Sequence, residues 1–363
     1  MIMPPQLALF ATAALAPVPL IAAAAVWGGV WVVAAVVWLT AVAAVIDAAA
    51  RRVTPATDGD EFPATAALTA TLVAAQIGLL ALAVWALTGG WLSVWEKAGV
   101  FVATGLFAGQ IGNANAHEAI HRPARWLRRL GEAAYASVLF GHHASAHPLV
   151  HHVHVATKGD PSSARLGEGF WRFAVRAWIG SFRAGFRAES VRLRRIGRAR
   201  WRHPYARYGA MSAAAGIVAW AIGGGAGLLV WVGLAVFAQV QLLLSDYVQH
   251  YGLSRSVVDG RAEPVGMRHS WNAGGLWSSA AMLNAPRHSD HHTHPARGFA
   301  ALKLPARGQA PTLPRSLPVM ACVALWPRAW RRVMDPRARI WRNGARATTG
   351  DWTGPAASGS MEA

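Results

Sequence analysis

Long apolar runs dominate this chain and alternate with shorter polar and basic segments. Six stretches are long enough for a helix to cross the roughly 30 Å hydrocarbon layer of a bilayer. Pro17 and Pro19 break the first run, and glycine-rich turns at 89–90 and 223–225 divide later ones, so three helical hairpins are expected. The predicted spans cover residues 6–24, 27–48, 64–88, 91–113, 208–225 and 227–249. The pattern thus predicts an all-α membrane protein with six transmembrane helices.

The two ends of the chain are expected to differ in order. The amino end, MIMPPQLALF, lacks the positive charge of a signal peptide, so we expect the first apolar run to be retained. Residues 1–340 are expected to form a single membrane domain. Residues 341–363 are rich in small and polar side chains, which predicts a disordered tail.

The positive charge is distributed unevenly across this topology. With the amino terminus inside, Lys97 is the only one of the 35 lysines and arginines on the outer side. Basic loops stay cytoplasmic, so the polar segments are expected at the cytoplasmic face of a bacterial inner membrane. The net charge of +18 fits attraction to anionic lipid heads or, alternatively, docking of an acidic electron carrier. Nucleic-acid binding is not expected, because the arginines between 182 and 201 alternate with aromatic residues, as in a membrane-surface helix.

Nine of the 15 histidines stand in four clusters near the expected cytoplasmic ends of the apolar runs. Neutral imidazole is the commonest metal ligand, and side chains four apart share one helix face, so these spacings present converging nitrogens. One zinc ion takes about four ligands, whereas nine imidazoles suit two iron ions with positions open for dioxygen. We therefore predict a helical, histidine-rich cytoplasmic cap that holds a di-iron site. Its expected ligands are His117, His121, His147, His151, His152, His250, His288, His291 and His292.

Other residues near these clusters are expected to support the ligands or to pack around them. Candidates for hydrogen bonds to ligand N–H groups are Glu118, Asp160, Asp246, His269 and Asp290. The roles of four further histidines are left open: His142, His143, His154 and His294.

Simpler interpretations exist for the individual clusters. HEAIH, which begins at His117, satisfies the H-E-x-x-H pattern of zinc metalloproteases, but such a site needs one further ligand rather than seven. The tract between His142 and His154 could be a loose metal-binding tract, although the Asp160-Pro161 turn after it indicates an ordered loop. The single cysteine, Cys322, excludes a resident iron–sulfur centre, so electrons must come from elsewhere.

The same segments carry a family resemblance. HEAIHR, HPLVHHVHVATKGDPSSAR, DYVQHYGLSR, HSWN and RHSDHHTHP occur in this order, and WPRAWRRVMDPR follows them. Together they resemble the motifs of the integral-membrane alkane 1-monooxygenases, within the membrane fatty acid desaturase and hydroxylase superfamily, from about residue 47 to 340. The resemblance implies a six-helix membrane enzyme whose nine histidines bind two iron ions. It also implies oxidation of a terminal methyl group by O2 to a 1-alkanol, with electrons from rubredoxin and rubredoxin reductase.

Other functional classes remain to be distinguished. A related di-iron enzyme would give an aryl alcohol from an aromatic methyl group, or an alkene as a fatty-acyl desaturase does. A metal transporter or sensor would need polar groups along a path through the membrane. The predicted spans are nearly devoid of them, since Asp47, Glu96 and Asp246 all lie near predicted ends.

Overall fold

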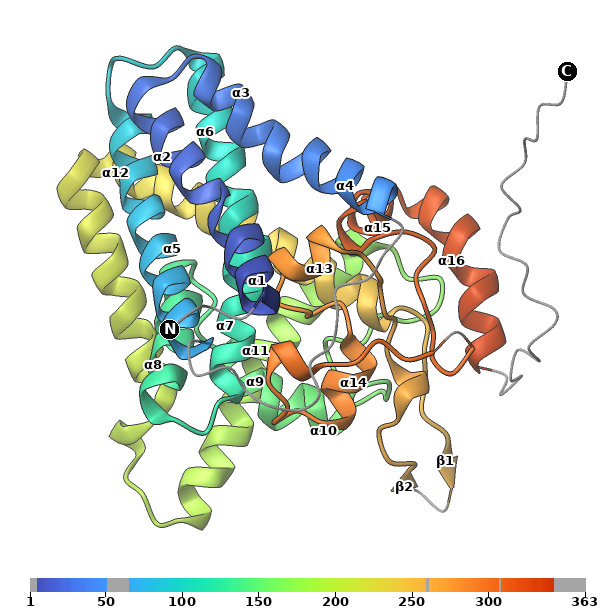
Figure 1. Cartoon of the computed structure of the whole chain (residues 1–363). Helices are drawn as coiled ribbons and strands as arrows, with labels where there is room; N and C mark the ends of the chain where they lie inside the picture. The colour runs from blue at the N-terminus through green and yellow to red at the C-terminus, as the bar shows by residue number, and fades with distance from the viewer. Residues whose placement is uncertain (1–4, 51–64, 259–260, 307, 343–363) are drawn as a thin grey trace, which may run out of the picture.

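The computed structural model of this chain describes residues 5–50, 65–258, 261–306 and 308–342. Within those residues the fold is mainly helical, and the strands form one short hairpin of β1 (Val257–Val258) and β2 (Arg261–Ala262). Figure 1 shows the long apolar helices rising from a lower layer of short helices and loops. The prediction of an all-α architecture is confirmed for this part of the chain.

The first apolar region is a helical hairpin. One arm contains α1 (Pro5–Leu15) and α2 (Pro17–Trp27), and the other contains α3 (Val30–Val37), the π-helix η1 (Trp38–Val42) and α4 (Ala43–Ala50). Gly28 and Gly29 form the turn with φ of 65° and 55°, a conformation that glycine adopts without a steric cost. The turn thus follows Trp27, a few residues later than the predicted boundary, and the prolines lie inside the first arm.

The second hairpin leads directly into the histidine-bearing layer. Its arms are α5 (Thr65–Thr88) and a rod made of α6 (Val94–Leu106), the π-helix η2 (Phe107–Gly112) and α7 (Asn113–His121). Ser93 and Glu96 form a capping box at the start of α6. Glu96 also accepts a hydrogen bond from the N–H of Gly29 at 2.6 Å, which ties the tips of the first two hairpins together.

The third hairpin is a single broken helix, α12 (Pro204–His250). Gly223 and Gly224 have non-helical backbone angles, and Gly224 has a φ of 57°, so the chain reverses there. A Cβ atom on Gly223 would lie 2.7 Å from a Thr88 methyl carbon, so this turn also needs glycine for its close approach to α5. The predicted division between residues 225 and 227 therefore falls one or two residues too late.

Four helices are long and apolar enough to cross a membrane, among the residues that the structure describes. They are Leu7–Trp27, Val30–Ala50, Thr65–Thr88 and Pro204–His250, the last of which contains both the fifth and the sixth predicted spans. The fourth predicted span, 91–113, is not among them, and it carries Glu96, Lys97 and Gln110. Six crossings and a cytoplasmic cap therefore stay predictions.

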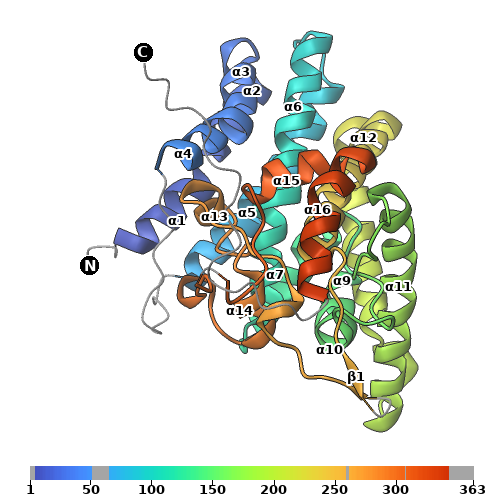
Figure 2. The ribbon, with the colours of Figure 1, turned by 90° about the vertical axis from the view of Figure 1, so that its right-hand side faces the viewer.

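The remaining helices surround the lower ends of these hairpins. Figure 2 shows α7, α9, α10 and α14 gathered in this layer, with α11 and α16 along its side. Trp330 of α16 packs on Tyr247 and Tyr251, with ring centroids 5.2 and 5.3 Å away, and so joins the carboxyl-terminal helix to the end of α12. The elements of this layer are α8 (Arg125–Ser137), α9 (His143–Ala146), η3 (His147–His151), α10 (His152–His154), α11 (Phe170–Arg195), η4 (Arg200–Arg202), η5 (Met267–His269), α13 (Trp277–Ala281), α14 (His288–Thr293), η6 (Phe299–Ala301), α15 (Leu317–Ala324) and α16 (Pro327–Arg342).

The boundary predicted at residue 340 falls inside α16, which continues to Arg342. The rest of the predicted tail, 343–363, lies outside the described residues.

Candidate metal centre

The nine predicted ligands come together in two adjacent groups. Within each group, one ring nitrogen from every histidine lies within 4.8 Å of the others. The other six histidines belong to neither group. The first group contains His117, His121, His147, His152 and His291, and the second contains His151, His250, His288 and His292.

Helical spacing explains part of this division. His117 and His121 lie four apart on α7 and share the first group, while His288 and His292 lie four apart on α14 and share the second. The intervening His291 faces the first group, so α14 supplies ligands to both.

The segment η3 divides its histidines differently, because it is a π-helix. The N–H of His152 donates to the carbonyl of His147, five residues earlier, so these two residues share a face. His147 therefore pairs with His152 in the first group, and His151 points to the second. The expectation that His147 and His151 converge on one point, as α-helical spacing predicts, was wrong.

The distances between the ring nitrogens are those expected for histidines that bind the same metal ion. In the first group Nε2 of His147 lies 2.7 Å from Nε2 of His117 and 3.0 Å from that of His152. In the second, Nε2 of His288 lies 2.9 Å from that of His250 and 3.1 Å from that of His292. Two nitrogens that bind one first-row metal ion at about 2.0–2.1 Å stand about 3 Å apart.

Hydrogen bonding alone does not satisfy these rings. A neutral imidazole has a single N–H, and that N–H can serve only one of several converging nitrogens. Nε2 of His121 and Nε2 of His151 are buried and have no hydrogen-bond partner. Since buried polar atoms are nearly always partnered, each group fits a metal ion that accepts the lone pairs of its histidines.

Burial favours the neutral, metal-binding form of most of these rings. It lowers the pKa of His121 to about 4 and that of His288 to about 3, and nearby histidines add to both shifts. Burial and neighbouring rings also hold the pKa of His117, His147 and His291 well below 6.5. Neutral imidazole binds metal without first releasing a proton.

His151 is the exception, because it has a carboxylate partner. Burial lowers its pKa, but the charge of Asp160 and a hydrogen bond outweigh burial and raise the pKa above 6.5. Nδ1 of His151 lies 2.8 Å from Oδ2 of Asp160, which also accepts a hydrogen bond from Ser163 Oγ, and Oδ1 of Asp160 accepts one from the N–H of Ser162. Asp160 therefore contacts a predicted ligand in the expected way and holds its ring.

Two other predicted supporting acids lie close to the histidines. Asp246 is buried one turn before His250, and its carboxylate lies near His151 and Ser162. Glu118 lies between His117 and His121 on α7, where it forms an ion pair with Arg122 at 3.3 Å. Glu118 also accepts a hydrogen bond from the N–H of Phe299, so it anchors η6 against α7.

Asp290 has different partners from those expected, whereas the backbone of His269 makes a hydrogen bond with the ring of His250. Asp290 accepts hydrogen bonds from His294, Arg297 and the N–H of Lys303, at 2.9, 2.6 and 2.8 Å, rather than from a histidine of the two groups. The reason is the helical phase of α14, which turns Asp290 toward the loop that follows while its neighbours face inward. The ring of His269 contacts Glu263 at 3.2 Å and accepts a hydrogen bond from the N–H of Gly266.

The four histidines whose roles were left open lie outside the two groups. His142 is buried beside Ser181, with 3.2 Å between Nε2 and Oγ. His143 is buried and packs its ring 4.9 Å from that of His147 without joining either group. His154 and His294 are exposed.

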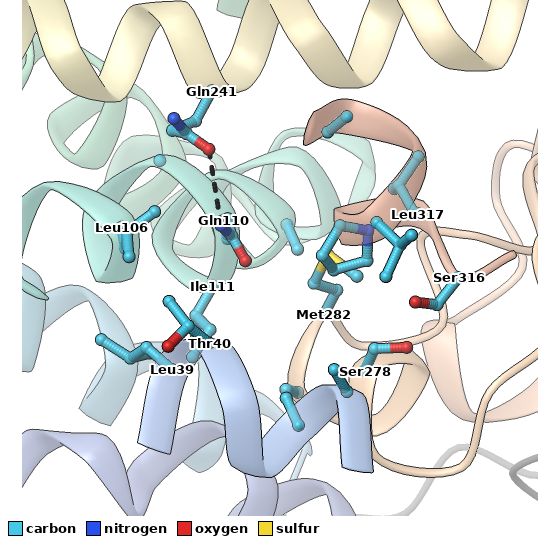
Figure 3. Close-up of a pocket in the computed structure, with 18 of the residues that line it drawn as sticks. Leu39, Thr40, Leu106, Gln110, Ile111, Gln241, Ser278, Met282, Ser316 and Leu317 are labelled. Carbon is cyan, nitrogen blue, oxygen red and sulfur yellow. Dashed lines mark hydrogen bonds between the residues drawn. The ribbon is translucent and has the colours of Figure 1, made fainter. Parts of the chain in front are cut away.

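A cavity of about 390 Å³ is lined by residues that shortly precede the histidines of the two groups, although none of the nine histidines is among the lining residues, and Figure 3 shows this lining. Asn113, Ser245 and Ala285 line it, and each precedes a predicted ligand by three to five residues, about one helical turn. The wall is mostly apolar, and the π-helices η1 and η2 contribute to it. Sequence reasoning did not identify this cavity, because alanine and glycine occur on every face of the spans.

Comparisons with known proteins agree with this arrangement. Residues 89–324, which include all nine histidines, match the fatty acid desaturase family model. Alkane 1-monooxygenase 2 of Pseudomonas aeruginosa is 33% identical over 276 residues, which cover 73% of this chain and 72% of that protein. Alkane 1-monooxygenase 2 of Alcanivorax borkumensis is 32% identical over 257 residues, which cover 68% and 65% of the two chains.

A third relative is named for a different substrate. The hydroxylase component of the xylene/toluene monooxygenase of Pseudomonas putida is 28% identical over 275 residues, which cover 73% of this chain and 72% of that protein. All three relatives are monooxygenases by name, and they match most of the chain. The chain is therefore a monooxygenase of the fatty acid desaturase family and belongs to the branch that contains the alkane 1-monooxygenases.

Proposed function

We propose that this protein hydroxylates the terminal methyl group of an alkane and releases a 1-alkanol. One atom of O2 enters the C–H bond, and the other leaves as water with two electrons from a reduced carrier and two protons from solvent. The observation that carries the proposal is the placement of two all-histidine groups beside an apolar cavity. The similarity to alkane 1-monooxygenases supports the choice of substrate.

We assign one iron ion to each histidine group. The five histidines of the first group and the four of the second would hold the two ions. Bound iron would supply the activation of O2 that no amino-acid side chain can supply. Imidazole suits iron, and the absence of a thiolate at the site fits iron better than a soft metal ion.

The chain itself contributes position and protection from water. Asp160 fixes the orientation of the His151 ring by accepting its Nδ1–H, which leaves Nε2 for the metal. The apolar walls of the cavity would hold a hydrocarbon chain with one end near Asn113 and Ser245, toward the histidines. They would also exclude bulk water from the reacting centre.

The electron donor must come from outside the chain, and we propose rubredoxin, supplied by rubredoxin reductase. The exposed face of α16 carries Arg328, Arg331, Arg332 and Arg339. A basic face of this kind attracts an acidic carrier and speeds its association. The same positive side would face the cytoplasm at a bacterial inner membrane, in accord with the distribution of basic residues.

A second candidate function is hydroxylation of an aromatic methyl group. The similarity to the xylene/toluene monooxygenase component over 73% of the chain favours it. Product analysis separates the two functions, because an alkane gives a 1-alkanol and a methylarene gives an aryl alcohol.

The test is turnover in membranes with rubredoxin, its reductase, NADH and O2. We expect medium-chain alkanes to yield 1-alkanols that carry the label of ¹⁸O2. Oxidation of methylarenes alone would favour the second function. Donor oxidation without any oxygenated organic product would reject both.

A further inference from the structure

Two glutamines face each other in the wall of the cavity. Gln110 lies on η2 and Gln241 on α12, and Nε2 of Gln110 donates a hydrogen bond to Oε1 of Gln241 at 3.4 Å. Figure 3 shows this bond and shows Oε1 of Gln110 directed into the space between η2, η1 and α13. Amide side chains are costly inside a membrane region, so their presence in an apolar cavity wall requires an explanation.

The local structure is built around this pair. Gln110 lies within a π-helix, a distortion that is frequent at functional sites. The preceding residue, Gly109, lets α12 approach closely, because a Cβ atom there would lie 2.5 Å from Cβ of Gln241. Both features bring the two amides together.

Two other glutamines of the apolar helices each make two hydrogen bonds to the protein. Nε2 of Gln76 donates to Ala134 O and Ser137 Oγ at 2.9 and 3.0 Å. Gln239 donates to Val138 O and accepts from Trp178 Nε1, both at 2.8 Å. These glutamines are structural ties between helices.

By contrast, the one bond between Gln110 and Gln241 is long, and each amide has further donor and acceptor sites. Both side-chain amide groups can also rotate by half a turn. Gln241 then donates the hydrogen bond and Gln110 accepts it. The pair can therefore offer the cavity either an acceptor or a donor.

The charge of the wall limits what these amides can bind. No lysine or arginine is among the described residues that line the cavity, and its one carboxylate is Asp47. One oxygen of Asp47 accepts hydrogen bonds from the N–H groups of Trp277 and Ser278, and the other is buried without a hydrogen-bond partner. A negatively charged substrate would meet no counter-charge among these described lining residues, which favours a neutral substrate over a fatty acid anion.

We propose that the cavity favours a neutral alkyl chain with an oxygen function, a hydroxyl or a carbonyl, which Gln110 and Gln241 bind. Gln110 precedes His117 by seven residues, so the oxygen would lie roughly 10 Å along the helix from the metal ligands. The opposite, methyl end of the chain would then reach the histidines. This inference rests on the proposed function and extends its substrates from alkanes to alkyl chains that carry a neutral oxygen function.

Binding tests the inference without any need for turnover. The purified protein in lipid nanodiscs is titrated with a medium-chain 2-alkanone and with the n-alkane of equal carbon number, at matched concentrations in the lipid. Wild type is expected to bind the ketone about tenfold more tightly than the alkane, because one or two neutral hydrogen bonds contribute about that much to affinity. A ¹³C-labelled carbonyl should also show the infrared shift of a hydrogen-bonded group.

Matched variants assign the effect to the amides. Gln110→Leu and Gln241→Leu should lose the preference and the infrared shift and retain alkane affinity within about twofold. Leu106→Met, which changes another lining residue, should keep both. Equal affinities in wild type, or loss of ketone and alkane binding together in the leucine variants, would overturn the inference. Failure of the proposed function would instead be seen as absence of hydroxylated products from every substrate.

Discussion

Asp160 contacts Nδ1 of His151 at 2.8 Å, while Nε2 of the same ring has no hydrogen-bond partner. This pairing fixes which nitrogen carries the proton and leaves the other for a metal ion. Asp160 is itself held by Ser162 and Ser163, so the loop after η3 orients a ligand of the second group.

Asp160→Asn should therefore weaken metal binding without unfolding the protein. The amide has the same shape but loses the charge that holds the His151 ring, and loss of such a partner typically lowers metal affinity about 10- to 100-fold. Iron content after dialysis against graded chelator concentrations measures the effect. Glu263→Gln, a change at an acid beside His269, serves as the control and should match wild type.

Two histidines that are both buried should behave in opposite ways. His151→Ala should lower the iron content and abolish turnover, because His151 belongs to the second group. His143→Ala should keep the iron, because its ring packs beside His147 without joining a group. Metal analysis of both variants checks this, and equal iron loss in the two would contradict the assignment.

Acid should destabilise the metal-free protein. His121 and His288 titrate near 6.5 when unfolded, whereas burial lowers their pKa to about 4 and about 3. At a pH between the folded and unfolded pKa values, the unfolded state binds more protons than the folded state. The free energy of unfolding therefore falls as the pH drops from about 6.5 toward 4. His151 contributes with the opposite sign, because its pKa is raised.

Thermal melting of the metal-free protein between pH 7.5 and 4.5 measures this dependence. His121→Gln should flatten the curve, since glutamine does not titrate. A variant curve as steep as that of wild type would contradict the role of His121.

Asp47 should stabilise the cavity wall, because it accepts hydrogen bonds from the first N–H groups of α13. Asp47→Ala removes this cap, which typically costs about 1 kcal/mol. Melting temperature and alkane turnover should both fall, whereas Asp47→Asn should keep most of the stability. Unchanged stability of the alanine variant would show that α13 does not need the cap.

The nine converging histidines could be predicted from the sequence, because three clusters have spacings that bring imidazoles together and His250 ends an apolar run at the same expected depth. Their division into two groups could not, since it depends on the π-turn that pairs His147 with His152. The partners of Asp290 were also missed, because the helical phase that turns it toward Arg297 depends on the loop after α14.

The hairpins followed from the apolar runs, while their turns were displaced by the few positions at which glycine adopts a positive φ, as at Gly224. The cavity depends on how η1, η2 and α13 pack, and no local pattern in an alanine-rich sequence encodes that packing.

Metal analysis combined with Mössbauer spectroscopy of ⁵⁷Fe-enriched, purified protein tests the central claim most directly. Two iron ions per chain in nitrogen-rich sites are expected, one from each histidine group. A single ion per chain, or zinc in place of iron, would contradict the account.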